Sequence, residues 1–236
     1  MGGVIVCLRV GGVIDIHKSF TPAVVGSPPV HRWVGFTMRK AVLALLVLVM
    51  LASIGWLTWI RSLETPAYSV IQADDGFELR RYASYIVAET AVIGDFETAG
   101  SRAFPPLANY IFGDNQQDQR MAMTAPVMSQ RQGEAWTYQF VMERRYDLEA
   151  LPRPLDPSIS IREVPAGLVA AHRLGGRWDS AAFAQAELKL LAAVQENGLV
   201  PVGEVTLARY DPPMTPFFLR RNELLVSVTE STFTIE

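Results

Sequence analysis

Few side chains in this sequence carry the chemistry of catalysis or metal binding, and they do not cluster. The 236 residues include one cysteine, Cys7, and three histidines. His172 is the one histidine after the N-terminal apolar region, and its apolar surroundings are typical of a partly buried structural side chain. Met121 and Met123 fall on one face of an extended stretch, where core packing is favoured over iron ligation. We therefore predict no catalytic residue and no metal ligand, and we expect the protein not to be an enzyme.

A short charged run near the C-terminus offers a different chemistry. Arg220 and Arg221 are followed by Asn222 and Glu223. A guanidinium fork can bind a ligand carboxylate through two parallel hydrogen bonds. The same residues can equally form a salt-bridge cluster at the end of a strand. The sequence leaves both interpretations open.

Two stretches combine residues that composition alone would rarely bring together. One contains Pro212, Pro213 and Pro216, and the other, 121–127, reads Met-Ala-Met-Thr-Ala-Pro-Val. Each proline fixes φ, lacks an N–H and drives the preceding residue toward extended geometry. We therefore expect residues 211–217 to form a stiff, apolar, non-helical loop that could serve as the wall of a ligand site.

Four motifs, in this order, resemble the SOUL/haem-binding protein family. They are 77–82 (Phe-Glu-Leu-Arg-Arg-Tyr), 110–113 (Tyr-Ile-Phe-Gly), 121–127 and 210–223. The resemblance covers about residues 66–228. It implies a distorted β-barrel with flanking helices, and haem or a related tetrapyrrole as the cofactor. It also implies an apolar groove between the first helix of the domain and the proline-rich loop.

In this sequence the implied groove falls on residues 101–112 and 210–221. Its members would be Arg102, Phe104, Leu107, Ala108, Ile111, Met214, Phe217 and Phe218, with Arg102 as the nearest cation for a propionate. Ser101 and Asn109 stand where animal members carry basic side chains, and Arg81 stands where one branch has its proposed axial histidine. Because arginine does not ligate iron, we expect burial of the macrocycle to supply most of the affinity.

The elements that would position this groove occur twice. Strand-like stretches lead into a helix after Gly94 and again after Gly176, at 77–82 and 85–93 in the first half and at 159–164 and 167–174 in the second. Further strands are predicted at 121–129, 136–142, 204–210 and 223–229, and a hairpin turn at 74–76. We predict an α+β fold in which a duplicated strand-strand-helix-strand-strand unit forms a distorted antiparallel β-barrel flanked by two helices.

The two predicted helices differ in regularity. The second begins at Asp179 or Ser180, ends at Asn197 and Gly198, and has an apolar stripe formed by Phe183, Ala186, Leu190, Ala193 and Val194. In the first, the pair Pro105 and Pro106 should kink or divide the helix after Arg102.

The N-terminal part contains one uncharged apolar run, Ala41 to Ile60. A run of about 20 residues is what a bilayer's hydrocarbon core requires. Arg39 and Lys40 precede it, so the positive-inside rule predicts a single-pass membrane protein whose C-terminal domain lies in the periplasm or outside the cell. A cleaved signal peptide is the alternative. We expect an unstructured or mis-called extension at 1–37, a transmembrane anchor at 38–61 and a SOUL-like haem-binding domain at 62–236.

Composition limits the range of partners. The net charge of −3 and the absence of a basic stripe exclude a nucleic-acid-binding surface. We expect a small hydrophobic ligand and the membrane as partners, and the function of holding or passing on a tetrapyrrole. The duplicated unit also resembles the effector-binding domains of bacterial regulators, so another small hydrophobic or cationic ligand is an alternative, with Glu89 and Glu143 as candidate buried acids. A purely structural or interaction domain is a further alternative.

Overall fold

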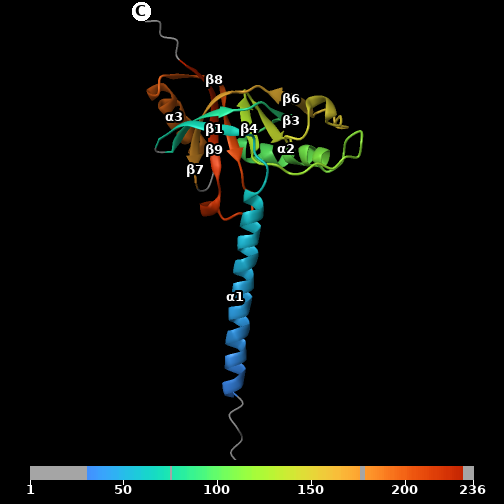
Figure 1. The fold of residues 1–236 in the computed structure, drawn as a ribbon, viewed down its shortest axis with the longest axis vertical. Coiled ribbons are helices and arrows are strands. Elements are labelled where there is room, and N and C mark those ends of the chain that lie inside the picture. The colour runs from blue at the N-terminus through green and yellow to red at the C-terminus, as the bar shows by residue number, and fades with distance from the viewer. Residues whose placement is uncertain (1–30, 75, 176–178, 231–236) are drawn as a thin grey trace, which may run out of the picture. The chain divides into compact units, whose positions relative to one another are not determined.

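The structure is a computed structural model that describes residues 31–74, 76–175 and 179–230. Cys7 and the other residues before 31 lie outside the described part. The described residues form three α-helices and two short 3₁₀ helices, shown in Figure 1. Their bounds are α1 His31–Arg61, α2 Phe96–Ile111, α3 Ser180–Glu196, η1 Leu148–Ala150 and η2 Phe217–Leu219.

Nine antiparallel strands form one sheet, which confirms the α+β class. Their bounds are β1 Tyr68–Asp74, β2 Phe77–Tyr82, β3 Tyr85–Ile93, β4 Val127–Gln132, β5 Ala135–Val141, β6 Ser160–Val164, β7 Gly167–Leu174, β8 Leu199–Arg209 and β9 Asn222–Glu230. The order across the sheet is β1-β2-β7-β9-β8-β4-β5-β3-β6. In the described residues β1 and β6 are the two edges and do not pair with each other, so the sheet is open and the expected closed barrel is not confirmed.

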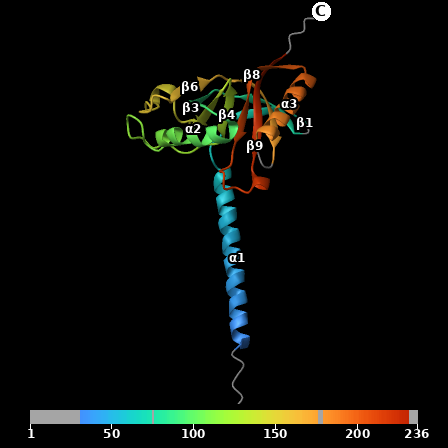
Figure 2. The same ribbon diagram turned by 180° about the vertical axis from the view of Figure 1, so that it is seen from behind.

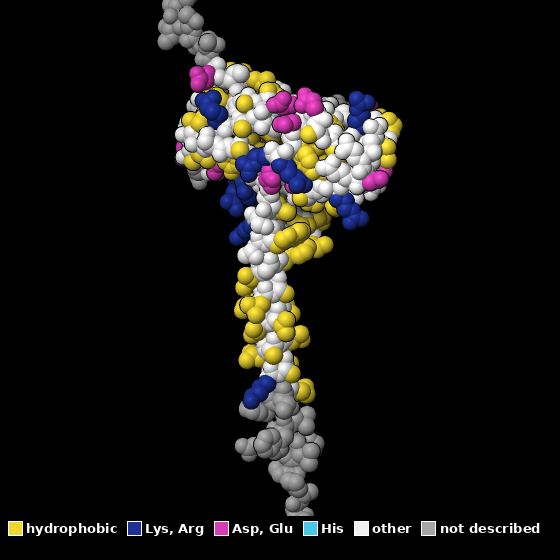
Figure 3. Space-filling model, turned by 45° about the vertical axis from the view of Figure 1, so that its right-hand side comes forward, with side chains coloured by type: hydrophobic (Ala, Val, Ile, Leu, Met, Phe, Trp, Pro, Cys, Tyr) yellow, Lys and Arg dark blue, Asp and Glu magenta, His cyan; other side chains and the backbone are white. Residues whose placement is uncertain are grey.

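Helix α1 has 31 residues and is therefore roughly 46 Å long at 1.5 Å per residue. Its segment Met38–Trp56 has a mean hydropathy of 2.0 and none of it is buried inside the protein. Figure 3 shows apolar side chains along its surface. By length and composition α1 could cross a membrane, although a signal sequence passes the same test. The helix begins at His31, seven residues before the predicted anchor and inside the extension that we expected to be unstructured.

Helix α2 is assigned as one helix through Pro105 and Pro106, so the prolines do not divide it after Arg102, and the predicted alternative of a kink stays a prediction. The two carbonyls that lose their N–H partners belong to Ser101 and Arg102, and both residues are exposed. Water can therefore satisfy these carbonyls, and the helix stays continuous while its other face packs on the sheet. The side chain of Asp95 caps the first turn by accepting a hydrogen bond from the Thr98 amide.

Helix α3 follows the sequence prediction closely. The Asp179 carboxylate accepts a hydrogen bond of 2.8 Å from the Ala182 amide and caps the first turn. Asn197 ends the helix, and Gly198 follows it with a φ of +68°. The predicted stripe faces the sheet, and its buried members are Phe183, Ala186, Leu190 and Val194.

The strand predictions at 77–82, 85–93 and 167–174 coincide with β2, β3 and β7. Strand β4 begins only at Val127, because Pro126 has no N–H for a ladder. Strand β8 begins earlier than predicted, at Leu199, and its pairing with β9 is irregular between Val202 and Thr206.

The sheet has two faces with different coverings. Residues of α2 and α3 share the main apolar core with one face, which we call the helix face. The two helices lie apart, with β4 and β8 between them (Figures 1 and 2). The other face, which we call the open face, has a smaller apolar cluster made of strand residues alone. Its buried members are Val87, Met128, Val141, Ala171, Ala208 and Leu225.

Candidate functional site

The residues predicted on α2 divide into buried and exposed positions. Leu107, Ala108 and Ile111 are at most 7% exposed and belong to the core of the helix face. Phe104 is 43% exposed, and its ring lies 5.2 Å from that of Phe140. Because Leu107 is fully buried, a charged substitution at that position would test folding rather than access of a ligand.

The other members of the predicted site lie in the proline-rich loop and at the start of α2. Met214, Phe217 and Phe218 are exposed. The Arg102 guanidinium donates a hydrogen bond of 2.8 Å to the carbonyl of Ile93. None of the three hollows described below is lined by any of the eight predicted residues. Their assignment to a haem site stays a prediction.

The open face instead carries a cluster of charged and tyrosine side chains. Arg80 and Glu223 form a fork-to-fork pair, with Nη1 of Arg80 2.6 Å from Oε2 of Glu223 and Nη2 3.1 Å from Oε1. Arg221 lies 2.8 Å from the same carboxylate, and the Tyr210 hydroxyl donates to it at 3.0 Å. The Tyr82 hydroxyl accepts a hydrogen bond from Arg80. We call these five residues the sealed cluster.

The protonation states of the sealed cluster follow from burial and from neighbouring charge. Burial favours the neutral carboxyl of Glu223, but the hydrogen bonds and charges of Arg80 and Arg221 outweigh it and hold its pKa below the usual range. Burial and the charge of Glu223 raise the pKa of Tyr210 above its usual range. Glu223 is therefore charged at neutral pH and Tyr210 remains a hydrogen-bond donor. Of the two interpretations of the charged run near the C-terminus, Arg221 and Glu223 therefore match the salt-bridge cluster.

Beside the sealed cluster lies a hollow of about 200 Å³, which we call the open-face cleft. It is lined by side chains of both halves of the sheet: Tyr82, Tyr85, Met128, Gln130, Gln139, Arg162, Val164, Val169, Val202, Glu204, Thr206, Leu225 and Ser227. The rings of Tyr82 and Tyr85 lie 6.2 Å apart at one side. Burial raises the pKa of Tyr85 to about 12, so its phenol stays protonated.

Arg162 is the arginine of the open-face cleft, and it has only one charged partner in the described residues. Its Nε lies 3.0 Å from both carboxylate oxygens of Glu89, which also accepts a hydrogen bond of 2.9 Å from Gln139. The Arg162 side chain is 44% exposed and that of Glu89 is 18% exposed. A ligand carboxylate could therefore reach the guanidinium from solvent.

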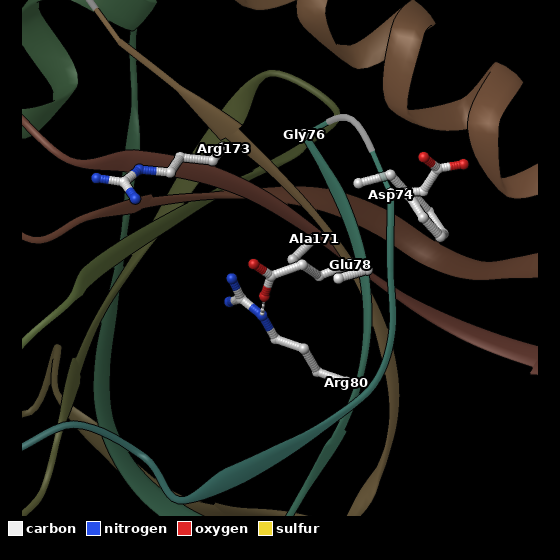
Figure 4. A pocket seen from close by; sticks show the side chains of 8 residues that line it. Asp74, Gly76, Glu78, Arg80, Ala171 and Arg173 are labelled. Atoms are coloured by element: carbon white, nitrogen blue, oxygen red, sulfur yellow. Dashed lines mark hydrogen bonds and ion pairs between the residues drawn. The ribbon is translucent and has the colours of Figure 1, made fainter.

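A second hollow, which we call the edge hollow, has a volume of about 290 Å³ and lies where β1, β2 and β7 meet. Figure 4 shows Glu78 and Arg80 pointing toward each other, and the guanidinium of Arg173, on β7, pointing away from them. Nε of Arg80 lies 2.8 Å from the Glu78 carboxylate. Arg80 itself is only 2% exposed, and its guanidinium pairs with carboxylates of the protein.

The helix face carries a third hollow, of about 530 Å³, between the first turns of α2 and α3. Phe96, Trp136 and Phe183 form its aromatic part, with Phe96 5.3 Å from Trp136 and 5.6 Å from Phe183. Glu187 and Glu204 also line it. Burial, and then the charge of Glu204, raise the pKa of Glu187. We call it the helix cleft.

The remaining predicted positions lie away from the open-face cleft. His172 alternates with Ala171 and therefore lies on the helix side of β7, where it neighbours Gly76. The Glu143 carboxylate accepts a hydrogen bond from the Ala122 amide and pairs with Arg145. Of the two candidate acids, only Glu89 contacts a residue of the open-face cleft, because it pairs with Arg162.

The sequence prediction missed Arg162, although a signal for it was present. The alignment that superposes Gly94 on Gly176 also superposes Arg80 on Arg162. Both arginines occupy the open face, and each pairs with a carboxylate there. The occurrence of arginine at equivalent positions of the two strands could have pointed to Arg162.

The open-face cleft offers three kinds of contact to a flat ligand with a carboxylate, and much of its remaining exposed lining is polar. Valine, leucine and methionine side chains supply apolar surface, the tyrosine rings supply faces for stacking, and Arg162 supplies a carboxylate partner. Haem and other tetrapyrroles with propionates have this chemistry. Among the lining residues, the buried Met128 and the protonated Tyr85 would be weak iron ligands.

Comparison with known proteins gives a family and a fold. The family described as SOUL heme-binding protein matches residues 63–227. No curated protein matches the chain significantly. The crystal structure of the EcmrR C-terminal domain is similar, with a TM-score of 0.51 and 16% identity, over 69% of this chain and 98% of that one. The cryo-EM structure of an EcmrR–DNA complex is similar too, with a TM-score of 0.50 and 15% identity, over 83% of this chain and 69% of that one. These two likenesses concern the fold alone.

Proposed function

Since this chain belongs to the SOUL heme-binding protein family, we propose that it binds haem or a related tetrapyrrole and holds it or passes it on without converting it. The observation that supports this role most directly is Arg162, half-exposed beside a cleft that contains tyrosine and aliphatic side chains. The macrocycle would lie on the tyrosine and aliphatic side chains of the open face, and one propionate would displace Glu89 from Arg162. Iron-free porphyrin should therefore bind nearly as well as haem.

A titration of the full chain in detergent tests the position of the ligand. We expect Arg162→Gln to weaken protoporphyrin IX by about tenfold, because a hydrogen bond to a charged group is lost. Arg145→Gln is the matched control, since Arg145 is also an exposed arginine in an ion pair but lies outside the cleft. The dimethyl ester of the porphyrin, which has no carboxylate, should bind the parent and Arg162→Gln equally.

The groove predicted between α2 and the proline-rich loop is the competing position. Phe104 is its accessible residue on α2. If Phe104→Gln weakens the porphyrin while Arg162→Gln does not, the ligand lies on the helix side. If the parent protein binds neither haemin nor the porphyrin at micromolar concentration, the proposed function is wrong.

A small hydrophobic cation is the second candidate ligand, and the helix cleft favours it. Aromatic rings there stand beside Glu187 and Glu204, and burial together with the charge of Glu204 raises the pKa of Glu187. A cation between them would relieve the repulsion between the two carboxylates and contact the ring faces. Binding of an aromatic quaternary ammonium that is lost in Glu187→Gln and retained in Arg162→Gln would support this candidate.

We also propose that α1 anchors the chain in a membrane, with the later residues outside the cytoplasm. Supporting this are its uncharged apolar run and the basic pair Arg39 and Lys40 before it. A reporter fused after Glu236 should be active only if it is exported. Full-length protein in the soluble fraction, or a mature N-terminus after Trp59, would contradict the anchor and favour a free or cleaved form.

The two halves of the domain are, we propose, a repeat of one unit. Pairing supports this: β3 pairs with β5 and β5 with β4 in the first half, while β7 pairs with β9 and β9 with β8 in the second. The antiparallel pair β4 and β8 would then lie beside the axis that relates the halves. A structure of a relative in which one half has a different strand order would contradict the repeat.

A further inference from the structure

The proline-rich loop between β8 and β9 exposes a group of large apolar side chains that the proposed ligand site does not use. Met214 is 73% exposed, Phe217 50%, Phe218 70% and Leu219 43%. The two phenylalanine rings contact each other at 5.4 Å in an edge-to-face arrangement. Water is a poor solvent for such a group, so the loop should find an apolar partner.

Several polar backbone groups of this loop are bonded within the loop. The amides of Thr215 and Leu219 donate to the carbonyls of Pro212 and Pro216, at 3.0 and 2.9 Å. The guanidinium of Arg220 donates to the carbonyls of Thr215 and Pro213. Internal bonds of this kind lower the cost of bringing a loop to the bilayer surface, because an unpaired polar group is costly in an apolar phase. The remaining amides can bond to water or lipid headgroups at that depth.

The loop lies at the end of the sheet where the chain arrives from α1. Arg221, at its base, donates from Nη2 to the Tyr68 hydroxyl at 3.4 Å, and Tyr68 opens β1. Glu64 is already fixed to the domain, because its carbonyl accepts from the Ala125 amide at 2.8 Å. Only two residues separate Glu64 from Arg61, the last residue of α1, so about 10 Å of chain joins the two.

Taking the anchor of the proposed function as given, we infer that this loop inserts Met214, Phe217 and Phe218 into the surface of the bilayer that holds α1. The short connection keeps the loop end of the domain near the interface. Aromatic and apolar side chains are favoured at that depth. The loop and α1 would together fix which end of the domain faces the lipid.

The test uses the full chain in lipid vesicles with Cys7→Ser as background, so that one introduced cysteine carries an environment-sensitive dye. The dye is placed at Phe218→Cys or Met214→Cys, and its quenching by nitroxide-labelled lipids is measured. Ile93→Cys is the matched control because Ile93 is also 70% exposed. Ile93 ends β3, seven residues and about 23 Å beyond Ile86, whose carbonyl accepts from the Met142 amide near the anchor end.

We expect both loop positions to be quenched roughly two- to threefold more than Ile93→Cys, since only they reach the acyl boundary. Each variant should unfold at the same temperature as the background protein, because these side chains are exposed. Equal quenching at the loop and at position 93, with the protein retained in the vesicles, would overturn the loop contact and leave the anchor intact. Release of the full chain by alkaline carbonate would overturn the anchor and the loop contact together.

Discussion

Two arginine–carboxylate pairs share the open face of the sheet, and they differ in their contact with water. In the pair Arg80–Glu223 the side chains are 3% and 1% exposed, whereas in Arg162–Glu89 they are 44% and 18% exposed. The first pair lies among other polar groups that complete its hydrogen bonds. The second has an arginine edge open to solvent.

The difference shows how neighbours decide what an ion pair can do. The ring of Tyr68 covers Arg80 at 4.5 Å, and Tyr210 and Arg221 bond the carboxylate of Glu223. Such a pair can be strongly destabilising to break, yet it has no free group for a ligand. Arg162 can exchange its carboxylate partner at little expense to the fold, because exposed pairs contribute little to stability.

The largest expected effect is on the sealed pair. Glu223→Gln should lower the free energy of unfolding by about 3–5 kcal/mol, because it removes the buried carboxylate and leaves Arg80 with only the more exposed Glu78 as a charged partner. Glu89→Gln is the matched control and should change it by about 1 kcal/mol or less. Urea denaturation of both variants of the full chain in detergent measures the difference. Equal losses of unfolding free energy in the two variants would contradict the difference between the buried and the exposed pair.

The same pair should give the protein a pH dependence. The pKa of Glu223 in the folded state lies below its ordinary value of 4.5, so its stabilising contribution is complete above about pH 4.5. It is lost as the pH falls through the folded-state pKa, when the carboxylate is protonated in the fold. Unfolding free energies should therefore fall more steeply in acid for the parent than for Glu223→Gln. Parallel profiles would show that Glu223 does not titrate in this way.

Arg80→Lys should have a smaller effect, since charge is kept and only the fork geometry is lost. We expect a loss of about 1–3 kcal/mol in the free energy of unfolding, corresponding to a hydrogen bond to a charged group. Arg162→Lys is the counterpart in the exposed pair, and its stability should match that of the parent within about 0.5 kcal/mol. Thermal and urea unfolding of the two variants would sharpen the contrast, and similar losses would argue against it.

The smallest expected effect is the coupling within the exposed pair. A double-mutant cycle of Arg162→Gln and Glu89→Gln should give about 0.2–1 kcal/mol, decreasing as salt is added. A coupling of several kcal/mol that salt does not alter would mean that Arg162 is held as tightly as Arg80. The proposed exchange of Glu89 for a ligand carboxylate would then be untenable.

Local patterns in the sequence were enough to predict several helices and strands and the protein family. The alternation of β2, β3 and β7, the Asp179 cap and the apolar stripe of α3 depend on neighbours within a few residues, and the sequence predicted them correctly. Four motifs along the chain indicated the family, and the match over residues 63–227 confirms it. The division of α2 was predicted wrongly, because the sequence does not show that the carbonyls freed by Pro105 and Pro106 face water.

Only the tertiary structure decided which charged and aromatic residues meet. Arg80 and Glu223 are 143 residues apart in the chain, and their pairing depends on β7 lying between β2 and β9. Packing of α2 on β3 and β5 buries Leu107, and the position of β6 at the edge of the sheet leaves Arg162 half-exposed. Sequence determines which side chains share a strand face, because the alternation is local. Strand order determines which faces become neighbours, because burial and pairing depend on contacts between distant segments.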